Sequence, residues 1–402
     1  MNIIFLGGLC PESERSRLHS LCNGPVQPAA QAFQWRIING LESNAGERLM
    51  ILSAYFVGTF PKYCKALRFK YYKWSSGDHG NAHNVPFTNL KVIQHFSKYR
   101  NLKRMVKTNK ITGDPDIMII YSAYFPFLMF ARYAKLHFPR MKVCLVVTDL
   151  PQYMGLGSKR SWYHQASMRY SERSSISLIG NVDCFVLLTE AMNSKINVLG
   201  KPYIVIEGMT TAQEYSDEEE VESQEKTVLY SGTLHRRYGI LRLLEAFSLT
   251  EDASFRLYVC GRGEASAEVA VAAKRDPRIK YLGVLEREAV VKLQRQCTLL
   301  VNPRQNNEEF TKYSFPSKII EYMEAAKPVV TYKLDGIPQE YDDHLIYVKG
   351  DSVEDLASAL ENTLNLPHSL RRDIGEKARR FVVEKKNHIA QTRKILEMLD
   401  AL

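Results

Sequence analysis

Residues 301–330 read VNPRQNNEEFTKYSFPSKIIEYMEAAKPVV, and this stretch decides the fold class of the C-terminal half. It predicts a strand that ends near Asn302, then a polar loop, then a helix that opens at Pro316. Proline suits a first helical turn, because the N–H groups of that turn have no partner within the helix. The apolar run at 328–332 predicts the next strand. This order of strand, helix and strand is typical of a parallel α/β unit.

Short apolar runs followed by helical spacing recur along the whole chain. Such strands, apolar on both faces and alternating with helices, favour parallel sheets that are covered on both sides. We therefore predict two doubly wound, Rossmann-like α/β domains, at 1–209 and 210–376. One amphipathic helix is expected at 377–402, with a return to the N-terminal domain as one option. The acidic stretch 216–226 predicts a solvated linker. The predicted strands are 2–6, 48–54, 116–121, 142–147, 182–188, 203–206, 227–231, 254–260, 278–282, 298–302, 328–332 and 345–348.

Composition narrows the class of protein. With 45% apolar and 24% charged residues among 402, the chain is expected to be globular. No window approaches the roughly 20 apolar residues of a membrane helix, and the first nine residues are too short for a signal peptide, so we expect a cytoplasmic protein. Seven scattered cysteines without a C-x-x-C pair argue against disulfides and zinc. Asp114 and Asp116 precede their strand and predict a turn, so no metal site is expected.

The positive charge is concentrated in the N-terminal half. Residues 1–209 hold 26 of the 54 Lys and Arg but only 12 of the 44 Asp and Glu. A basic half attracts nucleic acid, an acidic membrane or phosphorylated substrates. Cations alternate with aromatic rings at 62–73 and 91–110, which favours a membrane interface. The alternative for each run is a helix with a solvated basic face.

The segment around Pro316 also predicts an anion site. The unpaired amides of Phe315, Ser317 and Lys318, with the helix dipole, suit a phosphate, and Lys318 adds a charge. Glu321 shares the helix face of Lys318, and its carboxylate can accept two hydrogen bonds from a ribose diol. With Ser314 these residues describe a nucleoside diphosphate clamp. The alternative is an ordinary helix with an exposed ion pair.

Two further segments place polar residues after predicted strands. In VLYSGTLHRRYGILRLLEAF (228–247), Gly232 lets the backbone approach a ligand and Arg236 supplies charge beside it. The alternative there is a tight turn with a solvated basic rim. Asp149 follows the run 142–147, where a carboxylate can orient an acceptor hydroxyl or assist its deprotonation. The alternative for Asp149 is a residue that closes a turn before proline.

Taken together, GTLHRRYGILRLLEAF, YVCGRGE, YLGVLER, VNPR, SFPSKIIEYMEAAKPVV and LDGIPQE, in this order, resemble the C-terminal half of family 4 glycosyltransferases of the GT-B fold. The resemblance covers about 226–365, while the N-terminal half matches in architecture, with GG after the first strand and TDLP at 148–151. It implies two Rossmann-like domains facing a cleft and a retaining transferase. The sugar nucleotide would be bound mainly by the C-terminal domain and the acceptor by the N-terminal one, with no metal or other cofactor.

The resemblance also assigns roles to single residues. Glu321 matches the second glutamate of the E-x7-E pattern, which holds the ribose, and Phe315 falls on the backbone-contact positions beside it. Gly7 and Gly8 match the glycine loop that closes over the diphosphate. The G-x-G turn near the base is matched by Gly261 and Gly263.

Three usual donor contacts are replaced in this sequence. Tyr313 stands where the first glutamate of E-x7-E belongs, and Thr233 and Tyr238 stand at the arginine and lysine of G-R-x4-K-G. A departing diphosphate needs cationic stabilisation.

We therefore expect Arg304 and Lys318 to supply that charge, with Arg236 or Arg237 as alternatives. Glu309 or Glu308 is expected to take over the contacts to the sugar hydroxyls.

The resulting expectation is a metal-independent, retaining hexosyltransferase at the inner face of the cell membrane. It would transfer a sugar from a nucleoside diphosphate sugar to a saccharide or lipid-linked acceptor in cell-surface polysaccharide biosynthesis. The alternative is a non-catalytic GT-B relative that binds a glycan or nucleotide during assembly. Nucleic-acid binding has no recognised module behind it, so no nucleic-acid partner is expected; an epimerase or phosphorylase on the same fold stays open.

Overall fold

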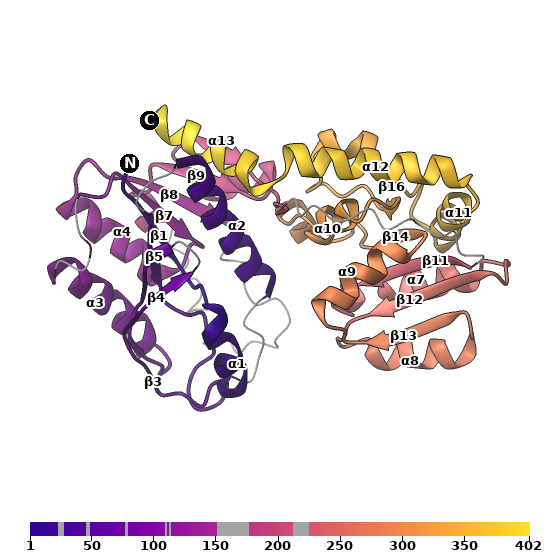
Figure 1. The fold of residues 1–402 in the computed structure, drawn as a ribbon, viewed down its shortest axis with the longest axis horizontal. Helices are drawn as coiled ribbons and strands as arrows, with labels where there is room; N and C mark the ends of the chain where they lie inside the picture. The colour runs from indigo at the N-terminus through magenta and orange to yellow at the C-terminus, as the bar shows by residue number, and fades with distance from the viewer. Residues whose placement is uncertain are drawn as a thin grey trace. The chain divides into compact units, whose positions relative to one another are not determined.

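The structure is a computed structural model that describes residues 1–22, 28–45, 49–76, 79–108, 111, 114–150, 177–211 and 225–402. The chain divides into two compact units (Figure 1). The first contains Met1–Glu207 and His388–Leu402, and the second contains Gly208–Asn387. Most of the acidic stretch 216–226 lies outside the described residues. None of the described helices is long and apolar enough to span a membrane.

The first unit is built on a doubly wound sheet. Among the described residues this sheet has eight strands in the order β10-β9-β8-β7-β1-β2-β5-β4, all parallel except β4. β1 and β7 are buried along their whole length, which is why each reads as an unbroken apolar run. The strands are β1 (Ile3–Gly7), β2 (Leu49–Ser53), β4 (Tyr72–Ser76), β5 (His79–Asn84), β7 (Ile117–Tyr121), β8 (Lys142–Val147), β9 (Cys184–Leu187) and β10 (Tyr203–Val205).

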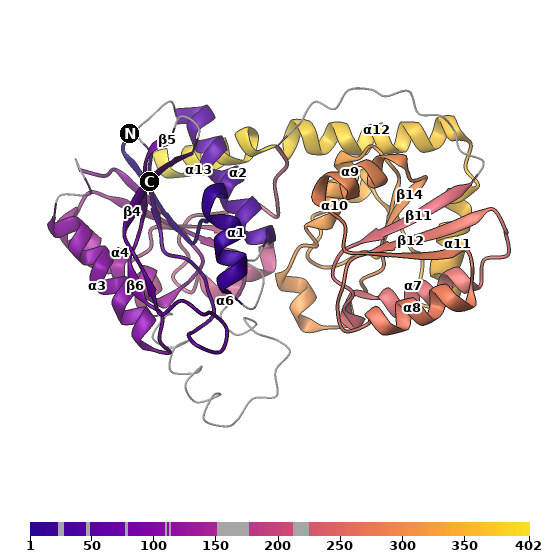
Figure 2. The same ribbon diagram turned by 60° about the horizontal axis from the view of Figure 1, so that its bottom comes forward.

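Helices cover both faces of this sheet: α2 and α13 lie on one side, and α3 and α4 on the other (Figures 1 and 2). A short antiparallel pair joins β3 (Arg68–Phe69) to β6 (Phe87–Thr88). The basic stretch 62–73 therefore contains strand residues. The described helices of the first unit are α1 (Glu12–Leu21), α2 (Pro28–Ala45), α3 (Ile93–Lys107), α4 (Phe125–His137), α6 (Asn193–Ile196) and α13 (His388–Asp400).

Over its described residues, the second unit contains a parallel six-stranded sheet in the order β13-β12-β11-β14-β15-β16. Its strands fall on the six apolar runs that the sequence predicts. They are β11 (Lys226–Ser231), β12 (Phe255–Cys260), β13 (Ile279–Gly283), β14 (Leu299–Asn302), β15 (Val329–Thr331) and β16 (Ile346–Tyr347). From β11 to β13 the chain builds one half of the sheet, and from β14 to β16 it builds the other half. The order therefore reverses in the sheet at the neighbouring strands β11 and β14. In open α/β sheets a ligand binds at such a switch point, beyond the carboxyl ends of the strands.

The helices of the second unit form two groups, with α7 against α8 and α11, and α10 against α12. They are α7 (Ile240–Ser248), α8 (Ser266–Arg275), α9 (Arg287–Gln296), α10 (Lys318–Glu324), α11 (Val353–Leu364) and α12 (His368–Lys385). The expected fold class, two Rossmann-like α/β domains, agrees with this architecture.

The prediction of one helix at 377–402 is wrong, because the chain forms α12 and α13 with a break between them. Lys386 is buried at the break, where its Nζ bonds Glu340 Oε1 at 2.5 Å and lies over the Tyr341 ring. Asn387 Nδ2 donates to the carbonyls of Val383 and Glu384 and so ends α12. Because Lys386 and Asn387 make these hydrogen bonds, α12 ends here and does not continue into α13.

α13 packs along α2 in the first unit. A Cβ on Gly40 would lie 2.3 Å from the carbonyl oxygen of His388, so only glycine allows this approach. Asn44 Nδ2 donates to Ile389 O at 2.7 Å and to Thr392 Oγ1 at 2.8 Å. α13 is thereby fixed to α2.

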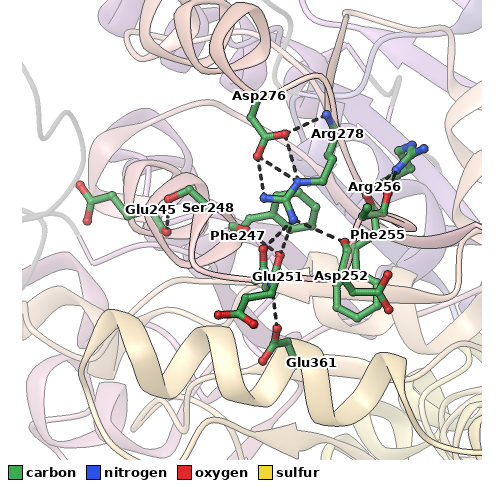
Figure 3. A network of polar contacts seen from close by, with 12 residues as sticks. Glu245, Phe247, Ser248, Glu251, Asp252, Phe255, Arg256, Asp276, Arg278 and Glu361 are labelled. Atoms are coloured by element: carbon green, nitrogen blue, oxygen red, sulfur yellow. Dashed lines mark hydrogen bonds and ion pairs between the residues drawn. The ribbon is translucent and has the colours of Figure 1, made fainter.

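A polar network holds the amino end of the second sheet, away from the switch point (Figure 3). Arg278 donates to Asp276 Oδ2 at 2.8 Å and to the Thr250 carbonyl at 2.6 Å, and its guanidinium lies 5.1 Å from the Phe247 ring. The hydrogen bond from Arg278 lowers the pKa of Asp276. Arg278 thus connects the end of α7 to the turn before β13.

We expect Arg278→Leu to lower the free energy of unfolding by about 2–3 kcal/mol at pH 7, because Asp276 and the Thr250 carbonyl lose their donor. Since the folded pKa of Asp276 is depressed, this stabilisation should disappear as the pH falls through that pKa. Urea unfolding at pH 7 and below pH 3 measures both effects. The control Arg372→Gln removes an exposed ion pair, and an equal loss in both variants would contradict the assignment.

Candidate functional site

The loops that follow β11 and β14 meet at the switch point of the second sheet. Tyr238, in the first loop, and Arg304, in the second, are in contact: the guanidinium carbon lies 5.5 Å from the Tyr238 ring centre. On its other side the same carbon lies 4.7 Å from the Phe310 ring centre. The aromatic ring at the position of the missing lysine therefore supports a cation from the neighbouring strand.

Arg304 is a buried cation without a direct ion pair among the described residues. Its residue surface is only 7% exposed, and its Nη2 donates to Ser314 Oγ at 2.7 Å. Its Nε is buried without a hydrogen-bond partner, and Glu308, a nearby carboxylate, pairs directly with Arg237 instead. Burial lowers the pKa of Arg304, while Tyr238 and Glu308 act to raise it, and a guanidinium stays protonated at neutral pH. A buried, unpaired cation is costly, so this position favours an anionic ligand.

A second polar cluster surrounds Glu321 in the first turn of α10. One carboxylate oxygen, Oε1, accepts hydrogen bonds from Lys318 Nζ and from Gln294 Nε2, both at 2.7 Å. Desolvation acts to raise the pKa of Glu321, but Lys318 and Gln294 outweigh it, and the pKa is lowered. Oε2 accepts no hydrogen bond from the described residues and remains available to hydroxyl donors.

Gln294 holds this cluster to the end of β11. It is 1% exposed, and its Nε2 also donates to Ser231 Oγ at 3.0 Å. The Tyr322 hydroxyl accepts a hydrogen bond from Ser231 N–H at 2.9 Å. Sequence reasoning missed Gln294 and Ser231, since a glutamine on an amphipathic helix gives no signal that it is buried.

The glycines beside these clusters allow backbones to approach one another. Gly261 has φ +130°, and a Cβ there would lie 1.8 Å from the Gly232 carbonyl oxygen. A Cβ on Gly263 would lie 2.3 Å from the Leu234 carbonyl oxygen, and one on Gly239 would lie 2.1 Å from that of Pro303. The loops after β11, β12 and β14 are thereby packed into one surface. Contact of Gly232, Gly261 or Gly263 with a ligand stays a prediction.

The start of α10 differs from the expected anion site. The helix begins at Lys318, not at Pro316, and has seven residues, so its dipole is small. Phe315 is buried with its ring 5.4 Å from that of Tyr341. Ser314 Oγ is engaged by Arg304 and by the Phe310 carbonyl, whereas Ser317 is exposed. In this structure the buried side chain of Arg304 is the stronger feature for holding an anion.

Other basic and acidic residues of these loops pair among themselves. Arg236 is exposed and bonds Glu268 Oε1 on α8. Arg237 Nε lies 3.3 Å from Glu308 Oε1. Glu309 is exposed at the start of a 3-10 turn, Glu309–Tyr313. Arg236, Arg237 and Glu308 are thus partly neutralised, which leaves Arg304 as the less compensated cation.

The residues at the three replaced positions are placed as follows. Thr233 is exposed and its carbonyl accepts the Tyr230 hydroxyl at 2.8 Å, whereas Tyr313 is buried. Neither brings a charge to the site.

In the first unit, the glycine turn after β1 is closed by two glutamines of α2. Gly8 N–H donates to Gln34 Oε1 at 2.9 Å, and Gln31 Nε2 donates to Gly8 O at 2.7 Å. Gly7 and Gly8 are buried, and a Cβ on Gly8 would lie 2.2 Å from the Phe56 ring. These glycines serve close packing here, and their contact with a diphosphate stays a prediction.

Asp149 follows β8 at the carboxyl edge of the first sheet. Desolvation by the surrounding protein raises its pKa to about 6, although more than a third of the residue remains accessible to solvent. A carboxylate with such a pKa can accept a proton near neutral pH. Asp116 lies at the opposite edge of the sheet, where Oδ2 accepts the N–H of Asn2 at 2.7 Å. Over the described part of the chain, no group of three His, Cys, Asp or Glu is placed to hold a metal ion.

We expect Gln294→Ala to lower the free energy of unfolding by about 1–2 kcal/mol, because Ser231 Oγ and Glu321 Oε1 lose a buried donor. Lys318→Ala removes a more exposed partner of the same carboxylate, so its effect should stay below about 0.5 kcal/mol. Urea unfolding measures both variants. Equal losses would show that Gln294 does not organise the cluster.

Comparison with known proteins relates both the sequence and the fold to glycosyltransferases. Residues 211–381 match the family model described as "Glycosyl transferases group 1". No curated protein matches the sequence. Among solved structures, HepE of Anabaena in complex with UDP is similar over the whole of both chains, with a TM-score of 0.66 and 15% identity.

Two further solved structures share the fold. Sucrose-phosphate synthase from Thermosynechococcus elongatus matches over all of both chains, with a TM-score of 0.65 and 15% identity. The apo form of the lipopolysaccharide outer core galactosyltransferase WaaB matches over 100% of this chain and 99% of its own, with a TM-score of 0.62 and 13% identity. The chain therefore has the two-domain fold of GT-B glycosyltransferases, and its second unit matches a glycosyltransferase family model.

Proposed function

We propose that this protein is a retaining glycosyltransferase that uses a nucleoside diphosphate sugar as donor. The observation that carries the proposal is the buried, unpaired guanidinium of Arg304 at the switch point of the second sheet. A diphosphate supplies the negative charge that this position lacks. The match of residues 211–381 to a glycosyltransferase family model supports the proposal, as does the UDP bound to the structurally similar HepE.

In this proposal each of the described side chains binds a different part of the donor. Arg304 and the Ser314 hydroxyl bind the diphosphate, and Lys318 adds mobile charge beside it. Glu321 accepts the ribose hydroxyls through Oε2, while Gln294 fixes Oε1. As the bond to the sugar breaks, negative charge grows on the departing diphosphate, and a cation held in place by Tyr238 and Phe310 stabilises it without reorganisation.

The acceptor is proposed to be a saccharide or a lipid-linked saccharide in cell-surface polysaccharide biosynthesis, bound by the first unit at the inner face of the membrane. Asp149 is proposed to accept or orient the proton of the attacking hydroxyl. The similar galactosyltransferase WaaB acts on the lipopolysaccharide outer core and supports an acceptor of this class. No metal or further cofactor is invoked.

A non-catalytic, nucleotide- or glycan-binding relative is the second candidate. Thr233, Tyr238 and Tyr313 favour it, because they remove two charged diphosphate contacts and one sugar contact of the family pattern. Such a protein would bind the nucleotide without releasing it from a sugar nucleotide.

We expect Arg304→Leu to weaken nucleoside diphosphate binding about 10- to 100-fold, the usual effect of losing a hydrogen-bonded charge. Thermal stability of the unliganded protein should stay equal or rise, because an unpaired buried charge is removed. Isothermal titration with UDP, GDP, ADP and dTDP, together with calorimetric melting, measures both quantities.

Arg380→Gln, an exposed arginine on α12, is the control. Unchanged nucleotide affinity in Arg304→Leu would contradict the proposed donor site. Binding of a sugar nucleotide by the wild type without turnover on any acceptor, including water, would favour the non-catalytic relative.

We expect sugar transfer to increase with pH through about 6, since Asp149 must lose its proton to act as a base and its pKa is about 6. Asp149→Asn should remove this rise and lower kcat while leaving nucleotide affinity unchanged. A pH profile of kcat/KM for both proteins tests the role. A wild-type profile that persists in Asp149→Asn would exclude it.

A further inference from the structure

The strongest charge asymmetry of the chain lies in residues 48–113. This stretch contains thirteen Lys and Arg and a single acidic residue, Asp78. It forms β2 to β6 and α3 in the first unit. The proposed donor site uses none of these residues, so the concentration of positive charge needs a different explanation.

Large apolar side chains are exposed among these cations. Val92 and Phe96 are each 57% exposed and Ile93 is 49% exposed, at the start of α3. Tyr63 and Leu67, in the segment before β3, are also exposed. Exposed apolar groups that cluster on one surface mark an interaction site more often than scattered ones do. We call the surface formed by these five residues and the cations around them the basic apolar surface.

Hydrogen bonds through Asn89 place the two parts of this surface side by side. Its N–H donates to the Leu67 carbonyl at 2.7 Å, and its carbonyl accepts the Phe60 N–H at 2.9 Å. Its side chain donates to the carbonyls of Gly58 and Ala66 at 3.0 and 3.2 Å. Asn89 lies only three residues before Val92, and α3 packs beside β6 (Figure 2). The exposed residues of the segment 58–67 therefore adjoin the start of α3.

The exposed face of α3 changes from apolar to basic along its length. Ile93, Phe96, Arg100 and Lys107 are exposed and lie on one face of the helix, and the partly buried Lys103 of that face lies over the Tyr133 ring. The opposite face is buried and includes Leu102 and Met105. α3 has no acidic residue in its 15 positions.

The backbone at the start of α3 also directs an apolar residue outward. Val92 has φ +67°, a conformation that is unfavourable for a β-branched residue. No side-chain cap stabilises this end of the helix. Val92 is thus exposed in a strained conformation, and Ile93 beside it is exposed as well. Contact with water does not favour two exposed apolar side chains at this position.

We infer that the basic apolar surface binds the anionic headgroup layer of a phospholipid bilayer. Cations on lipid phosphates together with apolar side chains at the acyl boundary are the combination that holds proteins at a membrane interface. Nucleic acid would use the same cations and would stack its bases on aromatic rings. Tyr63 and Phe96 could stack on bases, but Leu67, Val92 and Ile93 are aliphatic and suit an acyl boundary, so the lipid surface fits the whole set better.

This inference deepens the proposed function, because a membrane-bound protein is brought close to a lipid-linked acceptor. It rests on residues of the first unit, whereas the donor clamp lies in the second. Nucleotide binding by titration and vesicle binding are separate measurements. Failure of one is therefore distinguishable from failure of the other.

Co-sedimentation of the full chain with vesicles tests the inference. We expect binding to phosphatidylcholine vesicles that contain 30% phosphatidylglycerol, weak binding to pure phosphatidylcholine, and a decrease with added salt. Arg100→Gln with Lys107→Gln, and separately Ile93→Ser with Phe96→Ser, should each weaken binding about tenfold or more. Phe96→Trp should show a blue-shifted emission when vesicles are added.

Matched controls come from other surfaces of the same unit. Arg393→Gln with Lys394→Gln removes two exposed cations of α13, and Val198→Ser with Leu199→Ser removes two exposed apolar residues near β10. Both should bind vesicles like the wild type, and circular dichroism melting should confirm that all variants fold.

Three results would overturn the inference. The first is no preference for anionic over neutral vesicles, and the second is equal vesicle binding by the test and control variants. The third is binding to RNA that is lost in Arg100→Gln with Lys107→Gln but unchanged in Ile93→Ser with Phe96→Ser, which would assign the surface to nucleic acid.

Discussion

The guanidinium of Arg304 contacts one hydroxyl and two aromatic rings but, among the described residues, makes no direct ion pair, and Glu308 acts on it only from a distance. Folding therefore leaves a buried positive charge that the described residues offset only in part. Such a position is poor for stability and good for binding an anion. Tyr238 and Phe310 keep the charge in place, so a ligand need not immobilise the side chain.

The topology of the second sheet explains why these groups meet. β11 and β14 are neighbours although some 70 residues separate them, and their loops leave the sheet in opposite directions. Glycines at 239, 261 and 263 let the loop backbones touch. A surface made of packed backbone is rigid, which suits a site where charge must be met by fixed groups.

The sequence predicted the strands of the second unit well, because each is a short, largely apolar run and the central ones, β11, β14 and β15, are almost wholly buried. It missed β5, whose residues HGNAHN are polar. His83 and Asn84 are buried there. His83 forms hydrogen bonds with Tyr71 and Asn81, and Asn84 donates to the Lys70 carbonyl, contacts that a hydrophobic pattern does not reveal. Arg304 was expected from its neighbours in the chain. Its burial and its contact with Tyr238 were not predictable, since they depend on a loop from another strand.

The packing of α13 on α2 has a consequence for biosynthesis. While the chain emerges from the ribosome, the surface of α2 around Gly40 has no cover until His388–Leu402 has been made. The second unit, by contrast, is complete once Asn387 has emerged. The first unit thus begins to be made before the second but is finished after it, and a chain that stopped before His388 would leave α2 uncovered.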